Sequence, residues 1–237
     1  GFPTGVKWSF IPKDAATTYV VVNADESEPG TFKDREIIEG NPHQLIEGVA
    51  LCAYAIGAQV AYIYARGEFK YPIVGLQQAI DEAYRAGWLG RSIQGSHFSL
   101  DVHIHLGAGA YICGEETALL DSLEGKVGMP RSRPPFPAQA GLYGKPTVVN
   151  NVETLANVPP IVLHGVEWYR QFGTERSPGT KIFCLSGCIQ RPGNYELPLG
   201  TPLRVLIEDC GGGAPAGRHV KAILPSGASS QILAGYD

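Results

Sequence analysis

Apolar and polar residues alternate along the chain in a way that predicts strands and helices in turn. The run TYVVV at 18–22 predicts a strand, and the stretches 59–66 and 98–107 predict two more, the last with period two. Between them, 43–57 and 71–87 place apolar residues at helical spacing. Because strands and helices follow one another in sequence, we expect an α/β fold.

The pattern changes near residue 180. Short strands, tight Gly/Pro turns and one short helix over 202–210 predict a small α+β module. The stretch RQFGTERSPGT at 170–180 has the composition of a linker. We therefore predict two domains, 1–175 and 176–237. The chain opens on GFPTGVKW without Met and stops at ILAGYD, so we expect it to be a piece of something longer.

Composition narrows the function classes. The 237 residues are 44% hydrophobic and 18% charged, which suits an ordinary globular protein with a core. The formal net charge of −4 argues against nucleic acid as the main partner. No apolar run reaches the roughly 18 residues of a membrane-spanning helix, so we expect no direct membrane insertion.

Cysteines and histidines give little support for a metal site. Five cysteines, an odd number without a signal peptide, favour reduced thiols in the cytoplasm. Cys184 and Cys188 are spaced C-x3-C and lack a second pair. His103 and His105 share a strand face but have no evident third ligand, so we predict no metal in this chain.

Acidic residues crowd the loop after the first predicted strand. NADESEPGTFKDRE, residues 23–36, carries Asp25, Glu26, Glu28 and Asp34 together with a Pro-Gly turn. An acidic loop is usually solvated surface. The alternative is that these carboxylates face a ligand.

Three further segments are ambiguous when each is taken alone. GAGAYICGEETALL leads from a glycine loop into a helix with Glu115 and Glu116 in its first turn, which suits either an anion site or simple dipole complementation. GFPTGVKW is either a phosphate-holding loop, with Lys7 and flanking aromatic rings, or plain surface. Arg131, Arg133 and Lys145 surround a Pro-rich segment. After it, the Asn150–Asn151 pair and Thr154 mark a helix start, where they could cap the helix or hold a polar ligand.

Taken together and in order, these motifs closely resemble the flavin subunit of respiratory complex I, the bacterial F or mitochondrial 51-kDa type. The resemblance covers the whole chain, and LSGCIQRPGNYELPLGT resembles the start of that family's soluble-ligand-binding β-grasp module. Two departures are that the family's leading glycine-rich stretch is missing and that many relatives have Lys at the Arg133 position. The family's C-terminal helical domain, which carries a [4Fe–4S] cluster, is also absent from this chain.

The resemblance implies a Rossmann-like FMN/NADH-binding domain with two cofactor sites. The positions that match FMN-lining residues are Gly1, Lys7, Asn23, Asp25, Glu26, Glu28, Gly114, Glu115, Glu116, Asn150, Asn151 and Thr154. Those that match NADH contacts are Phe2, Phe10, Glu28, Tyr111, Glu116, Arg133 and Phe136. Glu28 and Glu116 would position the nicotinamide nucleotide, Glu28 would repel the extra phosphate of NADPH, and no side chain need act as acid or base.

The implied function is that of an NADH dehydrogenase subunit of NADH-quinone oxidoreductase. Hydride transfer from NADH to FMN would feed electrons singly to iron–sulfur clusters and quinone. Expected partners are the 24-kDa or E-type [2Fe–2S] subunit and the G-type subunit, on the cytoplasmic face of the inner membrane. This piece alone is expected to hold FMN weakly and not to pass electrons onward. The alternatives are a diaphorase subunit of an NAD-linked hydrogenase or formate dehydrogenase, and a non-catalytic docking scaffold.

Overall fold

The computed structural model describes residues 2–228 and 230–235 and divides the chain into two compact units. The first unit is made of residues 1–27 and 34–159, and the second of residues 28–33 and 160–237. Gly1, predicted to line the FMN, lies outside the described residues.

A parallel sheet forms the centre of the first unit. Its strands are β1 (Tyr19–Ala24), β2 (Val60–Ala65), β3 (Asp101–Leu106) and β4 (Thr147–Asn151), in the order β3-β2-β1-β4. The first three confirm the predicted strands. β4 was missed, because TVVNN is short and its asparagines were interpreted as the start of a helix.

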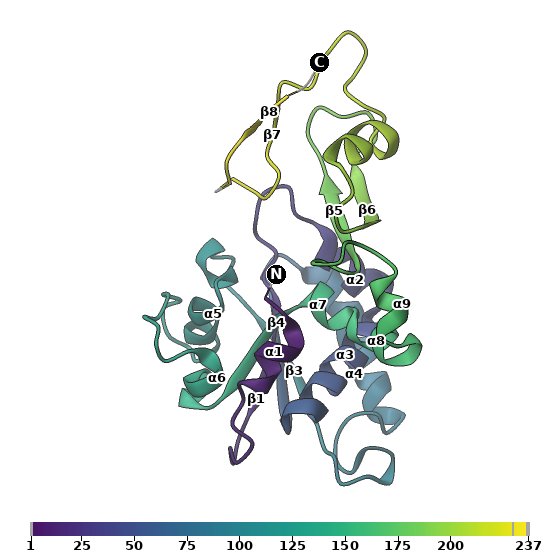
Figure 1. Ribbon diagram of the computed structural model, residues 1–237. Coiled ribbons are helices and arrows are strands. Elements are labelled where there is room, and N and C mark those ends of the chain that lie inside the picture. Colours follow the sequence, from purple (N-terminus) through teal and green to yellow (C-terminus); the bar gives the residue numbers. More distant parts are fainter. Residues whose placement is uncertain (1, 229, 236–237) are drawn as a thin grey trace. The chain divides into compact units, whose positions relative to one another are not determined.

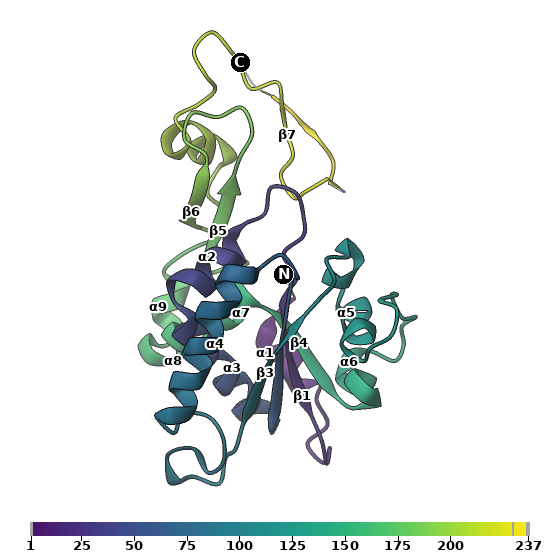
Figure 2. The same ribbon diagram turned by 180° about the vertical axis from the view of Figure 1, so that it is seen from behind.

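Helices cover both faces of this sheet. Figure 1 shows α3, α4 and α7 on one side of the sheet and α5 and α6 on the other, and Figure 2 shows the same arrangement from behind. The helices are α1 (Thr4–Ser9), α2 (Lys33–Gly40), α3 (Pro42–Ile56), α4 (Lys70–Arg85), α5 (Glu116–Leu123), α6 (Pro137–Ala140) and α7 (Val152–Ala156), with 3-10 turns η1 (Ile93–Gly95), η2 (Tyr111–Gly114) and η3 (Leu142–Gly144). The architecture is the predicted α/β layering.

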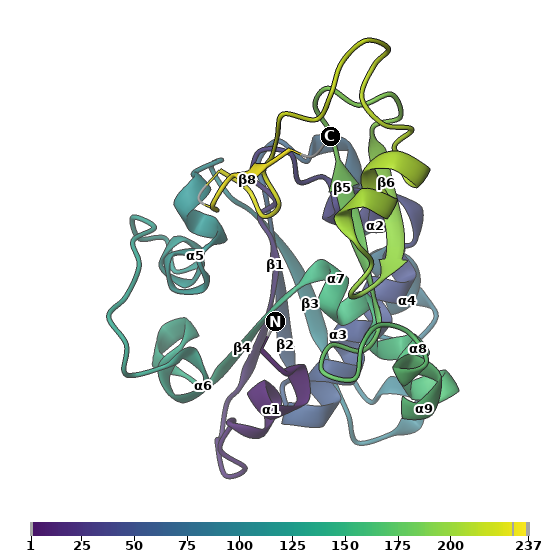
Figure 3. The ribbon, with the colours of Figure 1, turned by 45° about the horizontal axis from the view of Figure 1, so that its top comes forward.

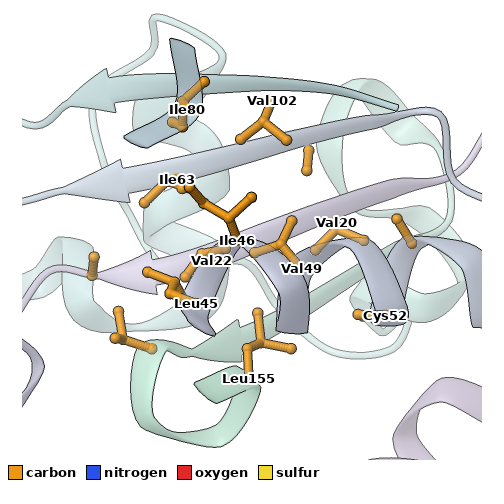
Figure 4. Packing of buried hydrophobic residues seen from close by; sticks show 14 of the residues in the cluster. Val20, Val22, Leu45, Ile46, Val49, Cys52, Ile63, Ile80, Val102 and Leu155 are labelled. Atoms are coloured by element: carbon orange, nitrogen blue, oxygen red, sulfur yellow. The ribbon is translucent and has the colours of Figure 1, made fainter. Parts of the chain in front are cut away.

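Alternate residues of β1 supply the two faces with separate cores. Val20 and Val22 point to the side of α3 and α4, where Leu45 and Ile63 pack with them (Figure 4). Val21 belongs to the other cluster, with residues of α5. This period-two alternation explains why β1 is apolar at successive positions, since a parallel strand is buried on both faces.

Helix α1 corrects the expectation of a glycine-rich loop at the start of the chain. Thr4–Ser9 is helical despite Gly5. Its Lys7 and Trp8 side chains both bond to β4, Lys7 Nζ to the Val149 carbonyl oxygen at 2.7 Å and Trp8 Nε1 to Asn150 Oδ1 at 2.8 Å. These long-range contacts stabilise a helix too short to persist on its own.

The second unit contains the antiparallel pair β5 (Thr180–Leu185) and β6 (Gly193–Pro198), visible side by side in Figure 3. The helix predicted over 202–210 is present as a short π-type helix, Val205–Cys210. Other elements of this part of the chain are α8 (Val158–His164), α9 (Val166–Arg170), β7 (Ala222–Ile223) and β8 (Leu233–Ala234).

Segment 28–33 is attached to the second unit by its neighbours in β5 and β6. The Phe32 backbone N–H donates to Cys184 Sγ at 3.3 Å, and Asn194 Nδ2 donates to the Phe32 carbonyl oxygen at 3.0 Å. The chain therefore enters this unit briefly after Ser27 and returns to the first unit at Asp34.

Within the described ranges, no helix has both the length and the apolar character needed to cross a bilayer.

Candidate functional site

The strand order creates a topological switch point in the first unit. The chain moves outward from β1 to β2 to β3 and then returns to place β4 on the other side of β1. The connections on either side of the β1–β4 pair therefore run in opposite directions. In open parallel sheets, ligands bind at the carboxyl ends of the strands at this point.

Asparagines tie the carboxyl ends of β1 and β4 together. Asn151 Nδ2 donates to the Asn23 carbonyl oxygen at 3.2 Å and to Asp34 Oδ2 at 2.6 Å. Asn23 Nδ2 in turn donates to the Gly114 carbonyl oxygen at 2.8 Å. Asn151 also caps α7, since its Oδ1 accepts from the Glu153 N–H at 3.0 Å. The capping interpretation is therefore correct for Asn151, which additionally fixes the strand ends.

Asn150 and Lys7 connect α1 to the same edge. Asn150 is 8% exposed and accepts the Trp8 indole N–H. The Lys7 ammonium lies 2.9 Å from Glu116 Oε2, with both side chains about three-quarters buried. A cation is thus held beside the carboxyl end of β4.

Asp25 and Glu26, in the acidic loop, are buried rather than solvated. Glu26 is 6% exposed and its carboxylate accepts from the backbone N–H groups of Asp34 and Arg35, at 2.8 and 3.2 Å. Asp25 is 8% exposed, and its Oδ2 accepts from Ser27 Oγ at 2.8 Å. Among the described residues, the buried Asp25 Oδ1 has no hydrogen-bond partner.

The environment of Asp25 disfavours its charge. Burial raises its pKa above the ordinary value, against the opposing effects of the Ser27 hydrogen bond and the Arg66 charge. Gly114 lies against it, because a Cβ there would be 3.4 Å from Asp25 Oδ2.

Glu115 and Glu116 differ in role. Glu115 Oε2 caps α5 by accepting from the N–H groups of Thr117 and Ala118, at 2.9 and 3.1 Å. Burial acts to raise the pKa of Glu115. The hydrogen bond from the Thr117 hydroxyl, the two backbone hydrogen bonds and the Arg133 charge outweigh it and hold the pKa below its usual value. Glu116 pairs with Lys7 instead.

Arg133 joins the two glutamates. Its Nη2 pairs with Glu115, and its Nη1 lies 3.3 Å from Glu116 Oε1. Arg131, two residues earlier, has a structural role, since its guanidinium contacts Asp121, Glu124 and the Gly141 carbonyl oxygen at 2.7–2.9 Å. Lys145 is exposed. The basic residues of the Pro-rich segment therefore do not form one cluster with a common partner.

The aromatic residues predicted to contact NADH are exposed. Phe2 and Phe10 flank α1 with ring centroids 6.0 Å apart. All four predicted aromatic residues are more than half exposed: Phe2, Phe10, Tyr111 and Phe136. Flat apolar surfaces that face solvent are available to stack on a planar ring.

Two further predicted site residues lie on other elements. Thr154 is half-buried in α7. Glu28 belongs to the second unit, where its Oε1 accepts from the Ala228 N–H at 2.6 Å.

Arg66, which follows β2 directly, was not predicted from the sequence. Its Nη1 donates to the Glu26 carbonyl oxygen at 3.0 Å. A charged residue immediately after an apolar strand was the available signal. Across the part of the chain that the structure describes, no three His, Cys, Asp or Glu side chains gather closely enough to hold a metal ion.

Comparisons with known proteins place this geometry in a family. Residues 1–160 match the family described as the Nuo51 FMN-binding domain, and residues 182–232 match the SLBB domain. The second F-type subunit of NADH-quinone oxidoreductase in Rhizobium meliloti is 60% identical over 234 residues, covering 98% of this chain and 56% of that protein. The Mycobacterium bovis F-type subunit is 57% identical over 98% of this chain and 53% of its own length.

A solved structure shares the fold over nearly the whole chain. The NAD+-reducing [NiFe]-hydrogenase in its H2-reduced state has a TM-score of 0.90 and 43% identity, covering 99% of this chain and 39% of that chain. The present chain spans about half the length of the curated relatives it matches.

Proposed function

Since the chain belongs to the Nuo51 FMN-binding domain family, we propose that it forms the FMN- and NADH-binding part of an NADH-quinone oxidoreductase flavoprotein subunit. The observation that carries this proposal is the set of polar side chains at the β1–β4 switch point, centred on Asp25.

These residues fit an FMN. The partnerless Asp25 Oδ1 is an acceptor that a ribityl hydroxyl would satisfy, and burying such an oxygen without a partner costs stability. Lys7, held at the carboxyl end of β4, supplies a positive charge suited to the phosphate or to an anionic flavin ring. The other residues proposed to hold FMN are Asn23, Glu26, Gly114, Glu115, Glu116, Asn150, Asn151 and Thr154.

NADH would use the exposed aromatic surfaces and the charged pair around Arg133. Phe2, Phe10, Tyr111 and Phe136 offer rings for stacking. Arg133 would pair with a phosphate of the dinucleotide, which requires it to exchange its contacts with Glu115 and Glu116. Glu28 would accept from ribose hydroxyls and disfavour NADPH by charge repulsion.

The chemistry that FMN supplies when bound is acceptance of two electrons from NADH followed by their release one at a time. The side chains of this chain bind and orient the two cofactors and set the charge around them. None of them is required to transfer a proton in the proposed reaction.

In the complete protein, the electrons would leave through a [4Fe–4S] cluster in a further C-terminal domain. Proposed partners are the E-type (24-kDa) and G-type subunits, with the assembly on the cytoplasmic face of the membrane. A second candidate is the diaphorase subunit of an NAD-linked hydrogenase, favoured by the TM-score of 0.90 to such an enzyme. The cofactor site would be the same in both.

A spectroscopic titration tests the proposal. The parent protein, extended at its N-terminus and reconstituted with FMN, is expected to show a bound flavin spectrum that NADH bleaches and NADPH does not. Glu28→Gln should raise the response to NADPH, whereas Glu47→Gln, at a solvent-exposed position of α3, serves as the control. A protein that retains no flavin, or whose flavin stays oxidised with NADH, would contradict the proposal and favour the docking scaffold.

A further inference from the structure

Arg66 lies at the carboxyl end of β2, next to the switch point. Its backbone N–H donates to the Ala24 carbonyl oxygen at 3.3 Å, which continues the pairing of β1 with β2. The residue is therefore fixed relative to the end of β1, the strand that carries Asn23 and leads into Asp25.

The guanidinium of Arg66 is shared between two partners. Nε and Nη2 lie 2.9 and 3.4 Å from the two carboxylate oxygens of Glu68, and Nη1 donates to the Glu26 carbonyl oxygen at 3.0 Å. Gly109 leaves room for this ion pair, since a Cβ there would be 2.8 Å from Glu68 Oε1. A planar fork held by a carboxylate through Nε and Nη2 presents Nη1 in a fixed direction.

Nη1 of Arg66 fixes the backbone of the acidic loop at Glu26. The Glu26 side chain is already committed to capping α2. The Arg66 bond adds a second anchor, on the carbonyl of the same residue, so Asp25 and Ser27 are held on either side of a doubly attached Glu26. The Arg66 bond is separate from this capping, because it uses the backbone carbonyl of Glu26 and not its carboxylate.

We propose that Arg66 is a positioning residue of the flavin site, which holds the Glu26 carbonyl and thereby directs the Asp25 carboxylate toward the bound FMN. The inference rests on the proposed function. It assigns a role to a residue that is not among those proposed to hold FMN or NADH.

The charge of Arg66 acts on the same carboxylate. The titratable and charged groups that face Asp25 are Arg66 and Glu68, from the segment after β2, and Tyr64, from β2 itself. Arg66 lowers the pKa of Asp25 against the larger effect of burial. Removing the cation should therefore raise that pKa further, so that Asp25 loses its charge at a higher pH.

The test measures FMN affinity by quenching of flavin fluorescence on the full chain with its native N-terminal extension. Arg66→Met is expected to weaken FMN binding about tenfold or more, as expected for loss of a hydrogen bond from a charged donor. Arg85→Met removes an exposed arginine on α4 and serves as the matched control. Arg66→Lys keeps the charge without the fork and should recover part of the affinity.

The pH dependence of FMN affinity separates positioning from general stabilisation. The pH below which FMN affinity falls (the acidic limb of the profile) should be higher in Arg66→Met than in wild type and unchanged in Arg66→Lys. In an Asp25→Asn background, Arg66→Met should move no limb. Thermal unfolding of each apoprotein shows whether a variant has folded, and Arg66→Lys keeps the test informative if the methionine variant has not.

The outcomes distinguish the two proposals. A wild-type protein that binds no FMN overturns the proposed function and this inference with it. If the wild type binds FMN and Arg66→Met binds it within twofold as tightly, only the role of Arg66 is overturned. A limb shift that persists without Asp25 also overturns it, because the effect would then not act through that carboxylate.

Discussion

Asp25 and Glu115 are two carboxylates of the same candidate site in opposite environments. Burial raises the pKa of Asp25, whereas the hydrogen bonds of a helix cap and a nearby arginine lower that of Glu115. Pairs of acidic groups whose pKa values are pushed apart are common where a protein must place charge deliberately. Here the difference makes Asp25 the carboxylate whose charge its surroundings disfavour.

The raised pKa of Asp25 predicts a specific pH dependence of stability. The folded state binds this proton more tightly than the unfolded chain does. The contribution of Asp25 to the free energy of unfolding is therefore fully present below the ordinary aspartate pKa and is lost as the pH rises through the raised folded value. Asp25→Asn should lack this loss.

Urea denaturation of the cofactor-free protein between about pH 3.5 and pH 7 checks the prediction. The stability of Asp25→Asn relative to wild type should improve as the pH rises. Asp14→Asn, at an exposed position, is the control. A constant difference between Asp25→Asn and wild type across this range would show that Asp25 ionises as readily in the folded state as in the unfolded chain.

The bond from Trp8 to Asn150 predicts a second effect of a single residue. Trp8→Phe removes the indole donor to Asn150 Oδ1, and Asn150 is only 8% exposed. We therefore expect the free energy of unfolding to fall by about 1–2 kcal/mol. Trp88→Phe, on a ring 59% exposed, should change it by less than about 0.5 kcal/mol. Chemical denaturation gives both values, and equal effects would rule out this role for the indole N–H.

At the scale of elements, α3 and α7 pack unusually closely. Gly48 in α3 faces the backbone of Leu155 in α7, where a Cβ would overlap the carbonyl oxygen. Because the obstructing atoms are backbone, a side-chain rotation cannot relieve the overlap. Glycine at this position thus fixes the approach of the helix that Asn151 caps.

Gly48→Ala should therefore lower the free energy of unfolding by about 3 kcal/mol or more. Gly75→Ala is the matched change in α4, at an exposed position with no atom within 4 Å of the added Cβ. It should raise stability by up to about 1 kcal/mol, because alanine favours the helix. Thermal or urea unfolding of the two variants measures both effects. A Gly48→Ala variant as stable as wild type would mean that α7 can move away from α3.

At the scale of elements, local patterns predicted the strands and helices that carry a clear apolar periodicity in their own sequence. The runs at 18–22 and 59–66, and the helical spacing in 43–57, became β1, β2 and α3. Strand β4 was missed because its ladder partner is the distant β1, and helix α1 because its contacts are with β4. The contacts of Lys7 and Trp8 reach across 142 positions, a separation that no local pattern can register.

Which residues of the candidate site lie together was predictable only in part. The Asn pair and the acidic loop were identified by composition and motif order, and the structure places Asn23, Asp25, Asn150 and Asn151 at one switch point. The contact of Arg66 with Glu26, from another strand, was not predictable. The separate partners of Arg131 and Arg133 also required the fold.

At the scale of the whole molecule, the chain crosses between its two units more than once. The acidic loop divides between Ser27 and Glu28, so Asp25 belongs to the first unit and Glu28 to the second. Two residues proposed to serve one reaction are thus stabilised by different sets of contacts. Changes in the β5–β6 pair should therefore reach segment 28–33 without disturbing Asp25.

Hydrogen exchange measured by mass spectrometry tests this separation. Asn194→Ala removes the donor to the Phe32 carbonyl oxygen and should speed amide exchange in 28–33 by about fivefold, with little change in β1. Gln190→Ala, whose side chain bonds to Gly212 and Ala214 in the same unit, is the control. Unchanged exchange in 28–33 would show that Asn194 does not hold the segment.

The assignment of segment 28–33 to the second unit also constrains recombination between genes of related proteins. A single crossover near residue 160 would join Phe32 of one parent to the β5–β6 pair of another. The hybrid would keep its sheet but inherit a mismatched anchor for the segment that follows the acidic residues. Viable recombinants are therefore expected to carry 28–33 and the later module from the same ancestor, which makes two distant stretches of the gene a single unit of inheritance.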